Sequence, residues 1–129
     1  MFEQLDFIYQ PSRDVAADVA YYESALGAEV VFTVERFATR VALVRIAPGE
    51  PGLLLAQHLD GEQAILIFRV PDLAIAEHQL ASQGCLLGER FEMPYGIGRQ
   101  LQLPGPQRLA IYQLTEPERG RSVEGRRDF

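Results

Sequence analysis

Hydrophobic positions along the chain form short alternating or continuous runs, interrupted by two stretches with helical spacing. Val15, Val19, Tyr22 and Leu26 recur three or four residues apart, which predicts one apolar helical face that ends at Gly27. A second helix is predicted over residues 72–83. The remaining runs predict strands over residues 5–10, 28–34, 37–46, 53–57, 64–70, 86–91, 99–103 and 109–114. The order is therefore strand, helix and three strands, given twice.

The chain also contains a loose internal repeat. The segment from Asp14 to Gly27 returns as the segment from Asp72 to Gly84, with an offset of 58 residues at the aspartate and 57 at the glycine. A repeat of this length is too long for a solenoid unit and fits a duplicated half-domain. Two half-domains that cannot each bury a core must pack or pair. The seam between them is therefore a natural place for a ligand.

Composition is that of one globular domain. The chain has 129 residues, of which 47% are hydrophobic and 23% charged. No stretch approaches the roughly 18 continuous apolar residues of a membrane span, and the N-terminus does not resemble a secretory signal. The single cysteine, Cys85, cannot form an internal disulfide and is expected to be a small buried hydrophobe. We expect a cytoplasmic protein with no membrane partner.

Charge excludes one large class of partners. The net charge is −6, and all twelve basic residues are arginines without a basic cluster in the folded part, so nucleic-acid binding is not expected. Residues 116–129 carry four acids and four arginines and have almost nothing to bury. We predict that they form a mobile C-terminal tail, which leaves residues 1–115 as the single domain.

The ordered motifs resemble the glyoxalase, bleomycin-resistance protein and extradiol dioxygenase superfamily, or vicinal oxygen chelate fold. The first half matches in Arg13-Asp14 and in a helix ending Tyr21-Tyr22-Glu23-Ser24-Ala25-Leu26-Gly27, close to the pattern aromatic-Tyr-x-x-x-Leu-Gly. The second half matches in Phe68-Arg69-Val70-Pro71-Asp72-Leu73, in Gly84, in Pro94-Tyr95-Gly96 and in the strand over residues 109–114. The likeness covers about residues 4–115. It implies an α+β fold in which two βαβββ modules, about 4–60 and 62–115, form a curved mixed β-sheet cleft with helices outside.

The resemblance also implies where metal ligands would lie. Superfamily enzymes generally hold a divalent cation with His or Glu side chains from four strands, and those positions correspond here to Phe7, Leu55, Ile65 and Ala110. Carbon side chains offer no lone pair to a metal, so we expect no metal and no other cofactor. Asp6, His58 and Gln113 lie near such positions along the chain. A shift of one residue moves a side chain to the opposite face of its strand, so these three are not expected to replace the missing ligands. The turn Leu103-Pro104-Gly105-Pro106 also lacks the acid of the superfamily's Asp-Pro-x-Gly.

Alternation along the strands predicts the side chains that would share the concave face. The resulting ligand-binding set is largely apolar, with polar groups towards its rim, as small-molecule pockets tend to be. Arg69 could take a carboxylate or phosphate, or it could pair with an acid such as Glu62 or Glu92. Tyr95, beside two glycines, is a candidate lid. The complete set is Phe7, Tyr9, Leu55, Gln57, Ile65, Ile67, Arg69, Tyr95, Ala110 and Tyr112.

Only two side chains, His58 and His78, are of the type that titrates near neutral pH. The pattern places His78 on an exposed helix face. It places His58 at a strand end, pointing away from the predicted cleft. No Ser-His-Asp spacing, Walker loop or Rossmann glycine pattern is present. The sequence therefore names no catalytic residue.

Three functions remain open at this point. The first is a metal-free protein that sequesters or carries a small organic molecule in a largely apolar cleft, as bleomycin-resistance proteins do. The alternative is a lyase, isomerase or dioxygenase of the same superfamily with an unconventional active site. The third is a mainly structural or regulatory dimer partner. The resemblance makes a homodimer the expected assembly in each case.

Overall fold

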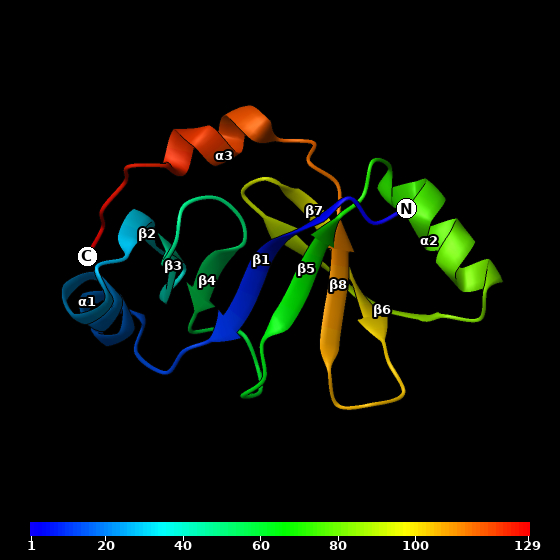
Figure 1. The fold of residues 1–129 in the computed structure, drawn as a ribbon, viewed down its shortest axis with the longest axis horizontal. Coiled ribbons are helices and arrows are strands. Elements are labelled where there is room, and N and C mark those ends of the chain that lie inside the picture. The colour runs from blue at the N-terminus through cyan, green and yellow to red at the C-terminus, as the bar shows by residue number, and fades with distance from the viewer. The chain divides into compact units, whose positions relative to one another are not determined.

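The computed structural model describes all 129 residues, with eight strands and three helices. They divide into two compact units, one of residues 1–6 with 65–122 and the other of residues 7–64 with 123–129. The prediction of two successive βαβββ modules is confirmed. The elements are β1 (Gln4–Pro11), α1 (Val15–Leu26), β2 (Glu29–Arg36), β3 (Thr39–Arg45), β4 (Gly52–Ala56), β5 (Ile65–Arg69), α2 (Leu73–Ser82), β6 (Leu86–Met93), β7 (Gly96–Gln102), β8 (Arg108–Tyr112) and α3 (Pro117–Val123) (Figure 1).

In the first module the strands lie in the order β2-β3-β4-β1. β2, β3 and β4 are antiparallel neighbours, whereas β1 runs parallel to β4 from Phe7 onwards. One face of this sheet packs against α1 through a cluster that includes Val15, Val19, Ala42 and Val44. Of the predicted apolar face, Val15 and Val19 are buried and Tyr22 packs against the same cluster, whereas Leu26 is exposed.

Helix α1 begins and ends where the sequence predicts. The carboxylate of Asp14 accepts a hydrogen bond of 3.0 Å from the backbone N–H of Ala17, so it satisfies one of the free amides of the first turn. Gly27 ends the helix in the left-handed conformation, with φ of 67°, which a residue without Cβ adopts at little cost.

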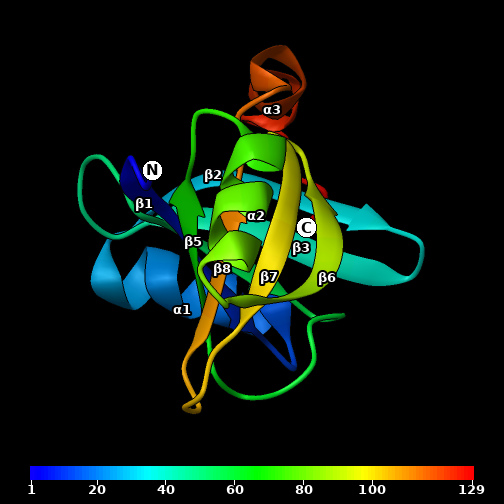
Figure 2. The same cartoon turned by 90° about the vertical axis from the view of Figure 1, so that its right-hand side faces the viewer.

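The second module repeats this arrangement with the strand order β5-β8-β7-β6. β5 and β8 are parallel, and β8, β7 and β6 are antiparallel. Helix α2 covers one face of these strands, as Figure 2 shows, and its side of the core includes Leu73, Leu80, Leu101 and Ile111. Cys85, expected to be buried, is half-buried beside this cluster.

Residues 116–129 do not form the free tail that the sequence predicts. Residues Pro117–Val123 form helix α3, and the segment after it lies along β2, near the C-terminal label in Figure 1. The tail was predicted because residues 116–129 contain few hydrophobic side chains. The segment is instead stabilised mainly by backbone hydrogen bonds to a strand edge, which do not require hydrophobic side chains. No helix of the structure is long and apolar enough to cross a lipid bilayer.

Candidate functional site

The first module presents a sheet face opposite α1, and the register decides which predicted residues lie on it. Phe7 and Tyr9 pair with Gly52 and Leu54, so these side chains share a face. Leu55 lies on the other face, in the cluster beneath α1. The prediction that Leu55 belongs with Phe7 and Tyr9 is therefore wrong by one residue, and Leu54 takes its place.

The second module confirms this one-residue correction through its own register. Ile67 on β5 pairs with Ala110 on β8, as Tyr9 on β1 pairs with Leu54 on β4. The next residue of β8, Ile111, packs beneath α2, just as Leu55 packs beneath α1. Ile65 and Ile67 alternate on the same face as Ala110, and all three are fully buried.

The positions that correspond to superfamily metal ligands carry no donor atoms. Phe7, Ile65 and Ala110 are buried hydrocarbon side chains. The corresponding position on β4 is also a buried leucine, whether it is Leu54 or Leu55. No group of three or more His, Cys, Asp or Glu side chains is arranged to hold a metal ion. These residues do not fit a divalent cation, whose first-row members bind imidazole, carboxylate or thiolate groups.

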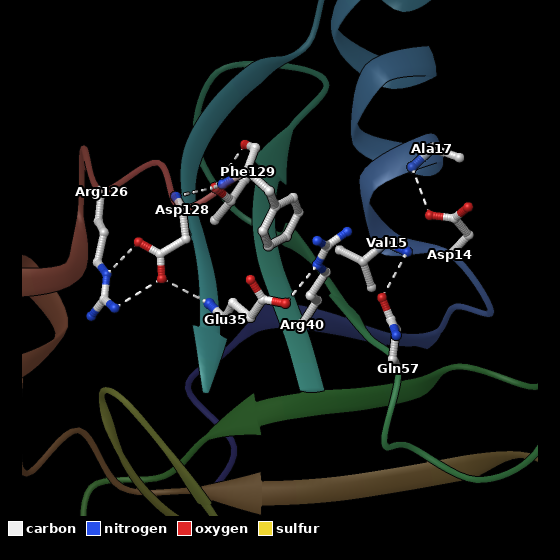
Figure 3. Close-up of polar contacts among 10 residues, drawn as sticks. Asp14, Val15, Ala17, Glu35, Arg40, Gln57, Arg126, Asp128 and Phe129 are labelled. Carbon is white, nitrogen blue, oxygen red and sulfur yellow. Dashed lines mark hydrogen bonds and ion pairs between the residues drawn. The ribbon is translucent and has the colours of Figure 1, made fainter. Parts of the chain in front are cut away.

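Gln57 is placed at a helix start rather than with Phe7 and Tyr9. Its Oε1 accepts a hydrogen bond of 3.4 Å from the N–H of Val15, in the first turn of α1, next to the Asp14 cap (Figure 3). Gln113 does the same in the second module, with 2.9 Å from the N–H of Leu73 to its Oε1. Each module thus uses the glutamine after its last strand to satisfy its own helix. A strand-end Gln at equivalent places in both halves of the repeat is the sequence signal for this role.

A hydrogen-bonded chain of three side chains lies at the end of the Tyr9 face. The Tyr9 hydroxyl is 3.0 Å from Nε2 of His58, and Nδ1 of His58 is 3.3 Å from the Thr39 hydroxyl. Tyr9 is buried, and this burial raises the pKa of its phenol, whereas His58 is exposed. The prediction that His58 points away from Tyr9 is wrong. The one-residue error on β4 extends to His58, which lies two residues beyond that strand.

Arg69 is an ion-pair partner, as one of the two readings of the sequence proposed, but its acids are different. Its Nε lies 3.6 Å from a carboxylate oxygen of Asp6 and 3.7 Å from one of Glu3, rather than near Glu62 or Glu92. Asp6 is buried and also accepts hydrogen bonds from the hydroxyl of Tyr112 and the side-chain amide of Gln4. Tyr112 is therefore part of a polar cluster around Asp6, which the strand pattern did not reveal.

Tyr95 does not have the structure of a mobile lid. It is buried, and its ring packs so closely on α3 that a Cβ on Gly120 would come within 2.2 Å of it. Its carbonyl accepts a hydrogen bond of 2.9 Å from the N–H of Glu116, and Arg119 donates to the neighbouring carbonyl of Pro94. The lid prediction failed because α3 itself was not predicted.

Two small open cavities lie beside the helix starts. One, of about 210 Å³, includes Arg13, Gln57 and Glu62 in its lining. The other, of about 330 Å³, includes Glu77 and Gln113. The remaining titratable candidate, His78, is exposed on α2 as predicted. The structure thus brings together Tyr9 and His58, which the sequence analysis separated, with Thr39, which it did not name.

Comparison of the sequence with protein families and with curated proteins found no match in either case. Comparison of structures found several of similar fold. The methylmalonyl-CoA epimerase of Mycobacterium tuberculosis has a TM-score of 0.74 at 19% identity, over 87% of this chain and 88% of that one. A Streptomyces coelicolor methylmalonyl-CoA epimerase variant in complex with 2-nitronate-propionyl-CoA has a TM-score of 0.72 at 17% identity, over 97% and 99%. A hypothetical protein of Bacillus halodurans has a TM-score of 0.72 at 12% identity, over 85% and 93%.

The chain has the glyoxalase-type fold of these structures. The fold prediction from the sequence motifs is therefore confirmed, and these similarities establish the fold alone. Several of the structural relatives are isomerases by name. Fold does not determine activity, because activity depends on the side chains of the site.

Proposed function

We propose that the protein is an isomerase-type enzyme that moves a proton on a small organic carbonyl compound, with Tyr9 and His58 in place of a metal centre. The hydrogen bond of 3.0 Å between the Tyr9 hydroxyl and Nε2 of His58 carries this proposal. It joins a buried phenol to an exposed imidazole, which gives a protected group a route to exchange protons with water.

The proposed resting state has a neutral phenol. Burial raises the pKa of Tyr9, so its O–H stays protonated and donates to Nε2 of His58. Nδ1 then carries the imidazole proton and donates to the Thr39 hydroxyl, which holds the ring in this tautomer. The same burial makes the Tyr9 phenolate, once formed, a stronger base than an exposed one.

The proposed reaction is a reversible proton transfer next to a carbonyl group. Tyr9 passes its proton to His58, and the phenolate removes a proton from the carbon beside the carbonyl, which leaves an enolate. Tyr9 then returns its proton to that carbon, which restores the substrate or, if the enolate has turned its other face to Tyr9, gives the isomer. Tyr9 is again a phenolate at that point, and it takes back the proton held by His58. Because His58 is exposed, protons at this carbon would exchange with water.

The fold relatives support the class of substrate. Several of them are methylmalonyl-CoA epimerases, and methylmalonyl-CoA has an acidic C–H beside a thioester carbonyl. The sequence had favoured metal-free binding over catalysis, and the relatives favour its alternative. The hydrocarbon side chains Phe7, Leu54, Ile65 and Ala110 support chemistry without a metal.

The test is incorporation of solvent deuterium into a panel of acyl-CoA thioesters and 2-substituted organic acids, followed by mass spectrometry and proton NMR. We expect one deuterium at the carbon beside the carbonyl of at least one compound. Tyr9→Phe and His58→Gln should each slow this incorporation by about 10²- to 10⁴-fold, the usual contribution of a general acid–base group.

The chain offers matched controls for both substitutions. Tyr21 is an exposed tyrosine on α1, and His78 is an exposed histidine on α2. Tyr21→Phe and His78→Gln should leave the exchange rate unchanged. The proposal fails if Tyr9→Phe and His58→Gln exchange deuterium as fast as these controls do.

A metal-free binding protein remains the second candidate, favoured by the apolar side chains at the former ligand positions. It predicts that a compound from the panel binds, as titration calorimetry would show, without any deuterium incorporation. Treatment with a chelator should change neither result. Cytoplasmic location and a homodimer stay predictions from the sequence.

A further inference from the structure

Strand β2 ends the sheet of the first module, and its outer edge would be open if the chain stopped after α3. β2 pairs with β3 on one side only. An open edge offers rows of backbone N–H and C=O groups to any other strand.

In the structure, residues 125–128 satisfy the edge group by group. The carbonyl of Val31 accepts from the N–H of Gly125 at 2.7 Å. The N–H of Thr33 donates to the carbonyl of Arg126 at 2.8 Å, and its carbonyl accepts from the N–H of Asp128 at 3.0 Å. The segment runs parallel to β2, with Thr33 opposite Arg127. It therefore acts as a short additional strand.

Side chains hold this segment in place. The carboxylate of Asp128 accepts from the N–H of Glu35 at 2.8 Å and from the Arg126 guanidinium at 2.8 Å (Figure 3). The buried Thr33 hydroxyl contacts the backbone of both Asp128 and Phe129. The ring of Phe129 packs against the core beneath α1 and lies 4.8 Å from the guanidinium of Arg40.

The sequence of β2 shows why such a cover is needed. Its central residues, Val30 to Val34, are uncharged and of high β-propensity. The strand at the equivalent place in the second module, β6, instead carries Glu89, Arg90 and Glu92. The charged residues of β2, Glu29, Glu35 and Arg36, stand only at its ends. Charged residues discourage pairing with another chain, so the middle of β6 has a protection that the middle of β2 lacks.

The exposed groups of β2 are also complementary to themselves. The outward groups that the C-terminal segment binds are the carbonyl of Val31, which lies at a bulge in the β2–β3 pairing, the N–H and carbonyl of Thr33, and the N–H of Glu35. In an antiparallel pair centred on Thr33, Thr33 lies opposite Thr33 of a second copy, and Val31 lies opposite its Glu35. All outward groups then find partners, as a two-fold symmetric interface requires.

We propose that the outer edge of β2 is a self-association surface for a second copy of this chain, and that residues 124–129 close it by occupying it. The occupant of the opened edge is β2 of the second copy, antiparallel and centred on Thr33. Release of the segment therefore converts a closed chain into one that pairs through β2.

The test uses the double variant Asp128→Ala and Phe129→Ala, which removes two anchors without altering β2. Amide hydrogen exchange of Thr33 and Glu35 is followed by NMR at low and high protein concentration, with mass measured by light scattering. In dilute solution both amides should exchange at least about tenfold faster than in the intact chain. At high concentration they should be protected again while the mass doubles relative to the intact chain.

Arg121→Ala, an exposed change on α3, is the control and should behave as the intact chain. A second variant, Gly125→Pro, removes the N–H bound to Val31 at a residue whose φ of 85° proline cannot adopt. Fast exchange that persists at high concentration, with no change in mass, overturns self-association through β2. Slow exchange in both variants in dilute solution overturns the proposal that this segment closes the edge.

Discussion

An ionic cluster around the buried Glu77 gives the sharpest test of the packing of the second module. Glu77 lies in the middle of α2 and faces the sheet, where its carboxylate accepts hydrogen bonds from two arginines. Arg90 on β6 donates at 2.9 and 3.2 Å, and Arg99 on β7 donates at 3.0 Å. The perturbation is Glu77→Gln, which keeps the shape of the side chain and removes its charge.

The magnitude follows from the exposure of the three partners. The Arg90 side chain is 58% exposed, so water screens its ion pair and we assign it at most about 0.5 kcal/mol. The Arg99 side chain is 24% exposed and that of Glu77 10%, so their hydrogen-bonded pair is closer to the range of about 1.5–3 kcal/mol for bonds to charged groups. We expect Glu77→Gln to lower the free energy of unfolding by about 2 kcal/mol.

Urea denaturation, followed by circular dichroism, measures this loss, and for a chain of this size it corresponds to a fall in Tm of roughly 8 °C. Glu89→Gln removes an equal charge from an exposed position on β6 and should change the free energy by less than about 0.5 kcal/mol. If Glu77→Gln is no more destabilising than Glu89→Gln, the assigned burial of the pair with Arg99 is wrong.

Three further predictions follow from contacts and pKa shifts. Gly120→Ala should destabilise the protein by about 1–3 kcal/mol in urea denaturation, because its Cβ would meet the Tyr95 ring at 2.2 Å and this outweighs the gain in helix propensity of about 1 kcal/mol. Because burial raises the pKa of Tyr9, its contribution to stability is complete below about pH 10 and is lost as the pH rises further; Tyr9→Phe should flatten that alkaline loss in urea titrations. The Arg126 hydrogen bond lowers the pKa of the Asp128 carboxyl, so that carboxyl should protonate only below its ordinary range. The Glu35 amide bound to it should then lose protection, measured as its exchange rate relative to the intrinsic rate at the same pH, and unchanged protection would contradict this contact.

The helices and the duplicated module order could be predicted because their signals are local. Asp14 and Asp72 each stand directly before an apolar helical face, and each accepts from a backbone N–H three residues on, as an N-cap does. Gly27 marks the end of α1 for an equally local reason, its positive φ. These determinants do not depend on the rest of the molecule, so a single sequence contains them.

The direction of the β4 side chains could not be predicted in this way. Leu53-Leu54-Leu55-Ala56 is continuously apolar, and a run without alternation does not indicate which residues face the helix. The β3–β4 and β1–β4 registers decide it, and both are long-range. The error placed Leu55 and Gln57 with Phe7 and Tyr9, and the same misreading separated His58 from Tyr9.

The paired glutamines show what the duplication keeps for structural reasons. Gln57 and Gln113 both follow the last strand of their module and both accept from the first turn of its helix. Loss of either would leave a helix amide without this acceptor, which costs about 1–3 kcal/mol when the group is buried. A role that both halves need is retained in both halves.

The Tyr9–His58 pair has the opposite distribution, and this argues that it is not needed for the fold. The residue of the second module with the register of Tyr9 is Ile67, and the residue after its capping glutamine is Leu114, so neither can form the hydrogen bond. Removing both polar partners at once removes the donor together with its acceptor, which is nearly neutral for stability. The Thr39 hydroxyl loses its contact with His58, but it is only half-buried, so water can replace that contact. Tyr9→Phe combined with His58→Leu should therefore cost less than about 1.5 kcal/mol in urea denaturation while deuterium incorporation is lost. A loss of stability above about 3 kcal/mol would instead make the pair a structural contact, and the proposed isomerase would then need another acid–base group.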